Sequence, residues 1–244
     1  MTADFVLHAL LGLLPVSCFL AALVYLDSYK LVPLKWVVGT IVLGCATAIA
    51  SYPVNLIGLQ WFSIDFTVYT RYFAPVVEEF LKAAIIWGLM RSNRIGFLVD
   101  AAIFGFAVGA GFAIFENMYY LTILPDMKLG TWIVRGFGTA IMHGGATAIF
   151  AVIAHTMLEQ HPTRGWIAVL PGLLIAAITH SVFNHFFFAP IINTALVLGI
   201  LPLLFTVVFD RSDKALSDWL GAGFDADTEL LELINSGEFS TSKV

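Results

Sequence analysis

Residues 71–92 read RYFAPVVEEFLKAAIIWGLMRS, and this stretch combines the apolar length of a membrane-spanning helix with internal charges. Glu78 and Glu79 are adjacent, and Lys82 follows within one helical turn of both. A charged side chain at the centre of a spanning helix costs roughly 2.5–3.5 kcal/mol on insertion scales. Lys82 can pair with either glutamate because residues three and four apart share a helix face. The three charges therefore mark this helix as a candidate functional element.

The two glutamates could also have a purely structural role. Acidic residues favour the first turn of a helix, and Pro75 is suited to that turn. A helix over residues 75–90 would, however, be only about 24 Å long, too short to span the hydrocarbon untilted. We therefore expect this helix to begin near Tyr72, with the glutamates below the membrane interface.

The composition of the whole chain is that of a protein embedded in a membrane. Of its 244 residues, 59% are hydrophobic and only 12% are charged, and the mean hydropathy is +0.90. A soluble domain carries about a quarter charged residues. We predict an all-α polytopic membrane protein whose surroundings are the lipid bilayer, and we expect no nucleic-acid partner.

Seven apolar stretches are long enough, or nearly so, to cross about 30 Å of hydrocarbon. They lie at residues 5–26, 34–54, 72–90, 96–121, 131–157, 166–188 and 191–209. The first lacks the basic flank of a secretory signal peptide, so we predict a retained transmembrane helix. Residues 51–71 are interrupted by Pro53 and Gly58, which predicts an extracytoplasmic loop or an interfacial helix with Trp61 as its anchor. Residues 1–209 are thus predicted to form one seven-helix domain.

The basic residues predict the orientation of the chain. With the N-terminus outside, the inner side receives Lys30, Lys35, Arg91, Arg94, Arg164, Arg211, Lys214 and Lys243, and the outer side receives Arg71, Lys128 and Arg135. Cytoplasmic loops carry an excess of Lys and Arg, so we predict a multi-pass protein with its N-terminus outside and its C-terminus in the cytoplasm.

Residues 210–244 differ in kind from the rest of the chain. Their acidic residues are Asp210, Asp213, Asp218, Asp225, Asp227, Glu229, Glu232 and Glu238, against three basic residues. The segment DADTELLELI has an acidic start and clustered leucines, which is compatible with one short helix. We favour a solvated, acidic cytoplasmic tail.

Polar residues recur on three further predicted helices. These residues are Glu116 and Asn117 on the fourth, Arg135, Thr139, His143 and Thr147 at a spacing of four on the fifth, and His180 and Asn184 one turn apart on the sixth. At 1.5 Å per residue, the carboxylates and imidazoles lie roughly 8–18 Å below the predicted outer ends of their helices. Four helices are therefore predicted to bring them to one level, around an interior polar cavity in the outer half of the bilayer.

This set of side chains suits the activation of water. Two neutral imidazoles and a carboxylate are usual ligands of a catalytic zinc, and Glu116, His143 and His180 are the predicted ligands. A second carboxylate, Glu78 or Glu79, can act as general base, and of the two we choose Glu79. Asn184 or a histidine could donate a hydrogen bond to the oxyanion of a tetrahedral intermediate. Lys82 and Asn117 are predicted to support the site.

A hydrolase is not the only function that these residues permit. Taken singly, an intramembrane histidine or asparagine is more often a hydrogen-bonded packing residue than a catalytic one. A proton- or cation-coupled transporter also uses buried Glu, Lys and His, although such proteins commonly show two related halves, and this chain has no convincing internal repeat. A non-catalytic scaffold could bind a membrane partner through the same polar groove. A serine nucleophile is weakly supported, because only Ser181 lies beside a candidate base.

Three short motifs resemble those of a known family. EEFLK at residues 78–82, FAIFEN at 112–117 and HSVFN at 180–184 are similar to the EExxK, FxxxEN and HxxxN motifs of the PrsW-type intramembrane proteases, and more distantly to the CAAX prenyl endopeptidases and the bacterial CPBP proteins. The resemblance runs from about residue 75 to 184, with the motifs in the expected order.

The resemblance implies a function and a site. It implies that Glu78, Glu79, Glu116, His143 and His180 form the active site of a protease in the bacterial plasma membrane. The implied substrate is a single-span membrane protein such as an anti-sigma factor, cut on its extracytoplasmic side. Both a metal-dependent mechanism, with Zn2+ as the candidate ion, and a metal-free glutamate and histidine mechanism are described for the family, and the sequence leaves both open.

Overall fold

The computed structural model describes residues 3–27 and 32–236, and all regular structure in these residues is helical. The elements in chain order are α1 (Ala3–Leu26), α2 (Leu34–Phe62), α3 (Phe66–Val68), η1 (Tyr69–Phe73), α4 (Ala74–Arg91), α5 (Leu98–Ile123), α6 (Leu129–Ile133), η2 (Val134–Thr139), α7 (Ala140–Gln160), η3 (Pro162–Val169), α8 (Leu170–His185) and α9 (Pro190–Ser236). Six helices of the described part are long and apolar enough to cross a membrane. The prediction of an all-α polytopic membrane protein is confirmed.

The helix α4 is a seventh long helix, and its charges distinguish it from the other six. It has 18 residues and includes Glu78, Glu79 and Lys82. The prediction that this helix begins near Tyr72 is wrong. The chain is helical from Phe66 onward, through the π-helical turn η1, so residues 66–91 form one helix of about 39 Å. That length removes the difficulty of spanning a bilayer with α4 alone.

The predicted break after residue 54 is also wrong. The helix α2 continues through Pro53 as far as Phe62, and Ser63 then takes a left-handed conformation that ends it. Asp65 starts the next helix, because its carboxylate accepts hydrogen bonds from the backbone N–H groups of Thr67 (2.7 Å) and Val68 (3.3 Å). These two hydrogen bonds lower the pKa of Asp65, and the bond from Thr67 has the larger effect. A proline inside a membrane helix is tolerated where neighbouring groups satisfy the freed backbone, which the sequence pattern alone does not reveal.

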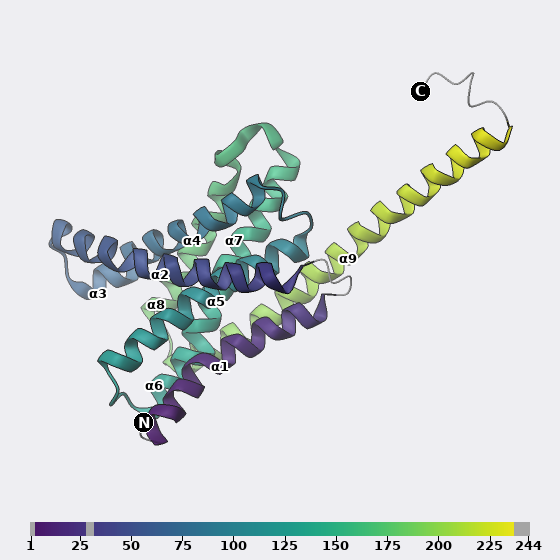
Figure 1. Ribbon diagram of the computed structural model, residues 1–244. Helices are drawn as coiled ribbons and strands as arrows, with labels where there is room; N and C mark the ends of the chain where they lie inside the picture. The colour runs from purple at the N-terminus through teal and green to yellow at the C-terminus, as the bar shows by residue number, and fades with distance from the viewer. Residues whose placement is uncertain (1–2, 28–31, 237–244) are drawn as a thin grey trace.

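The last helix does not stop at residue 209, where we placed the end of the membrane domain. The helix α9 has 47 residues and runs from Pro190 to Ser236 without interruption. Its final part projects well beyond the other helices (Figure 1). Hydropathy locates the edge of the apolar region, but charged residues such as those after Asp210 are compatible with a continuing helix. Glu238 and Lys243 lie outside the described residues.

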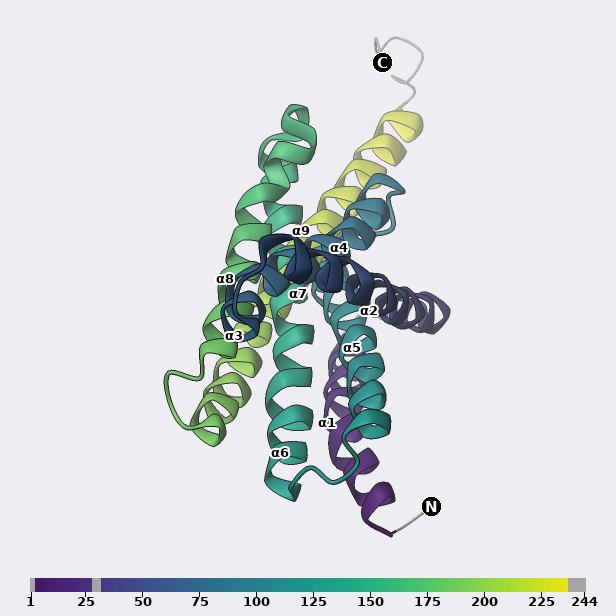
Figure 2. The same ribbon diagram turned by 90° about the vertical axis from the view of Figure 1, so that its left-hand side faces the viewer.

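The helix α5 forms the centre of the bundle, and two glycines allow its neighbours to approach closely. It is largely buried, and α2 crosses it at a steep angle (Figure 2). A Cβ on Gly111 would lie 2.0 Å from the carbonyl oxygen of Ile41 in α2. On the other side, a Cβ on Gly109 would lie 2.2 Å from the carbonyl oxygen of His143 in α7. The missing side chain of Gly111 thus sets the distance between α5 and α2. That of Gly109 sets the distance between α5 and α7, the helix that carries His143.

Candidate active site

The two adjacent glutamates of α4 have different environments. Residues next to each other on a helix are about 100° apart, so they face different neighbours. The Glu79 side chain is 1% exposed, whereas that of Glu78 is 15% exposed. Glu79 therefore belongs to the packed interior, and Glu78 lies at the more open side of the same helix.

Glu79 is surrounded by hydrogen-bond donors. Its Oε1 atom accepts from the Nζ atom of Lys82 and lies 2.9 Å from Nδ1 of His180. Its Oε2 atom accepts from the hydroxyl of Thr147 at 3.4 Å. Carboxylates so engaged serve as ion-pair and orienting partners. Thr147 belongs to the predicted stripe on α7, but we did not assign it to the site.

The hydrogen bonds of the two histidines assign different tautomers to them. Because ionised Glu79 can only accept, Nδ1 of His180 donates to it, and the Nε2 atom of a neutral His180 carries the lone pair. Lys82 can only donate, and its Nζ atom lies 3.2 Å from Nδ1 of His143. Nδ1 of a neutral His143 thus accepts, and its Nε2 atom carries the proton. The centroids of the two imidazole rings are 4.6 Å apart, and the rings meet edge to face.

Glu78 is held from outside α4 by a residue that the sequence did not indicate. Asn55 of α2 donates from Nδ2 to Oε1 of Glu78 at 3.1 Å and accepts from the hydroxyl of Tyr69 at 3.3 Å. The Oε2 atom of Glu78 lies 3.9 Å from Nε2 of His180, which exceeds a hydrogen-bond distance. Asn55 was missed because it follows Pro53, where we expected the helix to have ended.

Glu116 faces the same centre from α5 and is paired with Arg135. Its Oε2 atom lies 3.2 Å from Nη2 of Arg135 and 3.4 Å from Nε2 of His143. Arg135 also donates from Nε to Asn117 (2.9 Å), and Asn117 donates to the carbonyl oxygen of Gly12 (2.7 Å). Asn117 therefore supports the site through Arg135. The sequence pattern places Arg135 on the same helix face as Thr139 and His143, but it does not identify Glu116 as the partner of Arg135.

Three of these residues form a group that could hold a metal ion. One donor atom each from Glu78, His143 and His180 lies within 4.8 Å of the others. Glu116, the carboxylate that we predicted as a ligand, lies beside this group. Its Oε2 atom is buried and forms the ion pair with Arg135, although no hydrogen bond of good geometry reaches it from the described residues.

The donor set fits a metal, with one condition. The lone pair on Nε2 of His180 and the carboxylate of Glu78 are ready ligands, and the Glu79 bond to Nδ1 is the usual support of a metal-binding histidine. His143 can bind through Nε2 only if the proton moves to Nδ1, and the Lys82 ammonium then cannot remain its donor. Metal binding through His143 and the observed contact of Lys82 with His143 therefore exclude each other.

Two residues of the HSVFN motif besides His180 bond to backbone atoms. Asn184, a predicted oxyanion donor, donates from Nδ2 to the carbonyl oxygen of Thr70 at 3.1 Å. Ser181 donates its hydroxyl proton to the carbonyl oxygen of Arg71 at 2.6 Å. The serine proton is thus directed to a carbonyl and not to a general base, so the structure lends no support to a serine nucleophile.

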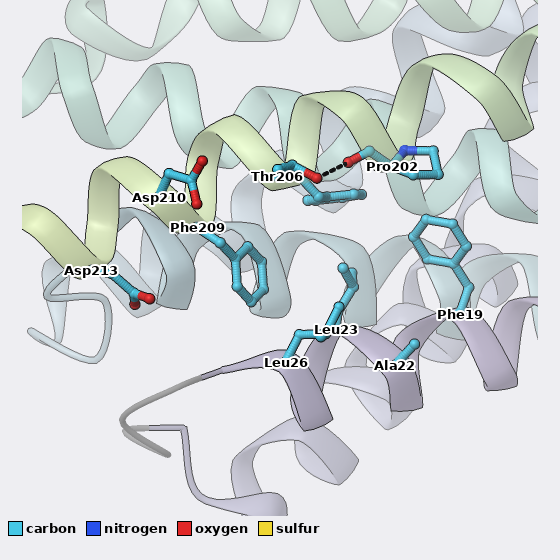
Figure 3. Close-up of a pocket in the computed structure, with 10 residues that line it drawn as sticks. Phe19, Ala22, Leu23, Leu26, Pro202, Thr206, Phe209, Asp210 and Asp213 are labelled. Atoms are coloured by element: carbon cyan, nitrogen blue, oxygen red, sulfur yellow. Dashed lines mark hydrogen bonds between the residues drawn. The ribbon is translucent and has the colours of Figure 1, made fainter.

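Two cavities lie away from these residues. One of about 450 Å³ opens between α1 and α9 and is lined by Phe19, Leu23, Phe209, Asp210 and others (Figure 3). A second, of about 350 Å³, is lined mostly by apolar side chains of α7, α8 and α9. Neither is lined by the glutamates or histidines of the cluster, so size alone does not locate the site. Convergent titratable groups are the better indicator.

The fold and the cluster together define the class of protein: a polytopic membrane protein with a buried glutamate and histidine site suited to hydrolysis. The model of the PrsW family of intramembrane metalloproteases matches residues 32–209. The chain belongs to this family, and it is accordingly an intramembrane peptide hydrolase. No curated protein and no solved structure matches the chain.

Proposed function

We propose that this protease cuts a single-span membrane protein, such as an anti-sigma factor, near the extracytoplasmic face of a bacterial plasma membrane. The observation that carries the proposal is the convergence of Glu78, His143 and His180, with Glu79 bonded behind His180. Partly exposed carboxylates at Glu78 and Glu116 lie on the open side of this group. A peptide bond brought there would meet acceptors for a proton and a donor for its oxygen.

In the proposed mechanism, Glu78 is the general base. The gap of 3.9 Å between its Oε2 atom and Nε2 of His180 suits one water molecule that donates a proton to each acceptor. Glu78 takes the proton as the water oxygen attacks the peptide carbonyl carbon, and it later delivers that proton to the departing amine. Asn55 keeps the carboxylate in place by its bond to Oε1.

His143 is the proposed oxyanion donor. Its Nε2–H is fixed by the Lys82 contact at Nδ1, and the imidazole ring is buried. A neutral donor held in a water-poor site stabilises a developing oxyanion more strongly than it would in water. Glu116 and Arg135 bound the same space and would orient the peptide.

Zn2+ is the proposed candidate if the enzyme uses a metal. Glu78, His143 and His180 would hold it, with Glu116 as the remaining carboxylate and general base. When bound, the ion would acidify the attacking water and polarise the peptide carbonyl. In that case Lys82 would have to leave Nδ1 of His143.

The test is cleavage of a single-span substrate in reconstituted membranes by the wild type, Glu78→Gln and His180→Ala. We expect both variants to fold and to lose about 10²–10⁴-fold in turnover, the usual contribution of a general base. Thr179→Ala is the matched control, because its hydroxyl bonds to Ile175 within α8, and it should cut at the wild-type rate. Wild-type rates in both Glu78→Gln and His180→Ala would contradict the proposal.

Metal content measured on the same purified proteins separates the two mechanisms. In a zinc enzyme the wild type retains about one ion per chain, and His180→Ala loses it together with its turnover. An active wild type without metal that is insensitive to chelators supports the metal-free mechanism.

A further inference from the structure

Two consecutive backbone carbonyls, those of Thr70 and Arg71, lie where the π-helical turn η1 gives way to α4, and Pro75 has no N–H to offer either of them. Proline has no N–H, so residue 75 cannot donate to Arg71, four residues earlier, as an α-helix requires. It equally cannot donate to Thr70, five residues earlier, as the π-helical spacing of η1 requires. Ala74 still donates to Tyr69 in that wider spacing. An N–H at position 75 could serve only one of these two carbonyls, so the proline removes one donor, and the change from π-helical to α-helical spacing leaves the other carbonyl in need of a partner.

Both carbonyls receive a donor from the same neighbouring helix. Ser181 of α8 donates to the carbonyl oxygen of Arg71, and Asn184, three residues later on the same face, donates to that of Thr70. Unsatisfied backbone groups are especially costly where water is scarce, as in a membrane protein. The two side chains therefore connect α8 to the turn just before Pro75, in the helix over residues 66–91.

This connection lies close to the contact between His180 and Glu79. His180 precedes Ser181 in α8, and Glu79 lies four residues after Pro75 in α4. The bond between Nδ1 of His180 and Oε1 of Glu79, at 2.9 Å, is made between the same two helices. A shift of α8 along α4 would lengthen that bond and turn the Nε2 atom of His180 away from Glu78.

We propose that Ser181, together with Asn184, is a positioning residue that holds His180 against Glu79 by bonding to the carbonyls of Arg71 and Thr70 beside Pro75. The proposal rests on the proposed function in so far as it concerns turnover. It gives Asn184 a different role from the oxyanion donor predicted from the sequence, because its amide is engaged by Thr70. The proposal also gives the Ser181 hydroxyl a function other than that of a nucleophile.

A double-mutant cycle between Pro75 and Ser181 tests the proposal. We expect Ser181→Ala to lower turnover per folded molecule about 10-fold or more, as small misplacements of reacting groups do, with KM changed by less than about twofold. Ser181→Thr keeps the hydroxyl and should recover most of the rate. In a Pro75→Ala background the restored N–H can serve the Arg71 carbonyl, so removing the Ser181 hydroxyl should lower turnover by less than about twofold. Thr179→Ala serves as the control on α8.

The four proteins of the cycle should also be compared by thermal unfolding in detergent. We expect Ser181→Ala to lower the unfolding midpoint less in the Pro75→Ala background than in the wild type. Such a difference supports the hydrogen bond independently of activity. Equal losses in the two backgrounds, by both readouts, would overturn the proposal. So would a loss of turnover in Ser181→Ala that only follows its loss of folded protein. A wild type that cuts no substrate refutes the proposed function, while the midpoints still decide whether the bond exists.

Discussion

Two adjacent glutamates of the EEFLK motif have different surroundings, which is why we propose different roles for them. Glu79 accepts from Lys82, His180 and Thr147 and is closed off from solvent. Glu78 is bonded to Asn55 and retains an oxygen directed toward His180. The motif itself does little to separate the two as candidate bases. The surroundings favour Glu78 for proton transfer and Glu79 for charge balance.

This division predicts different stabilities for two variants of equal chemistry. Glu79→Gln leaves the buried Lys82 ammonium without its counter-charge, and removing one partner of a buried ion pair typically costs about 3–5 kcal/mol. Glu78→Gln removes no buried partner of this kind and should change stability by less than about 1 kcal/mol. Unfolding of both purified variants in detergent measures the difference. Equal midpoints would show that Glu79 is not the partner that stabilises Lys82.

At the scale of elements, two of the helices that carry site residues, α4 and α7, each follow directly on a π-helical turn. The turn η1 precedes Pro75 and Glu78, and η2 precedes His143. Such wider turns shift the phase of the residues that follow, and they are frequent at functional sites. A regular helix pattern, with 3.6 residues per turn, therefore predicts the wrong facing for residues beyond the turn. The glycines of α5 then let these helices approach.

Gly109→Ala tests whether close packing of α5 against α7 places His143. The added methyl group would meet the His143 carbonyl oxygen at 2.2 Å, so the backbone of one helix must move. We expect a loss of about 1–3 kcal/mol in stability and a lower turnover per folded molecule. Gly39→Ala in α2 is the matched control, because no atom lies within 4 Å of its added Cβ. The control should be neutral or slightly stabilising. A Gly109→Ala protein that behaves like the control would contradict the role of this contact.

At the scale of the whole molecule, two helix beginnings that we predict to lie outside the cell are found at one end. The beginnings of α1 and α6 lie at the same end of the molecule in both views (Figures 1 and 2). The excess of basic residues on the other side predicts that this end faces outward. The acidic extension of α9 would then project into the cytoplasm.

Cysteine labelling tests this orientation. In a chain without Cys18 and Cys45, Asp4→Cys should react with a membrane-impermeant maleimide on intact cells, because residue 4 is predicted to lie outside. Thr228→Cys, in the exposed end of α9, should react only after the cells are opened. Labelling of Thr228→Cys on intact cells would reverse the orientation, and with it the side on which the substrate is cut. Blocking with impermeant reagent before lysis is the control.

Much of the site could be predicted from residue types and spacing. Charges in hydrocarbon are costly, so Glu78, Glu79, Lys82, Glu116, His143 and His180 stood out from their apolar surroundings, and the structure brings them together. Asn55, Thr147 and Arg135 were not assigned to the site, although all three contact it. A single amide, hydroxyl or guanidinium is common in membrane helices, and its importance depends on a partner that is distant in the sequence.

The class of fold, and the residue types that meet at the candidate site, could be predicted from the amino-acid sequence alone. The length of an apolar stretch indicates whether it can span the hydrocarbon, and a charged residue within it has a known free-energy cost. Both can be evaluated without knowing the neighbouring helices. Tertiary structure decided the pairing, because His180 and Glu79 are 101 positions apart and meet only when α8 packs on α4. It also decided which glutamate is enclosed, where the helices end and which side chains donate to the carbonyls of Thr70 and Arg71 beside Pro75. Those outcomes depend on the groups that neighbouring helices present, and hydrogen bonds of that kind leave no periodic pattern in the chain.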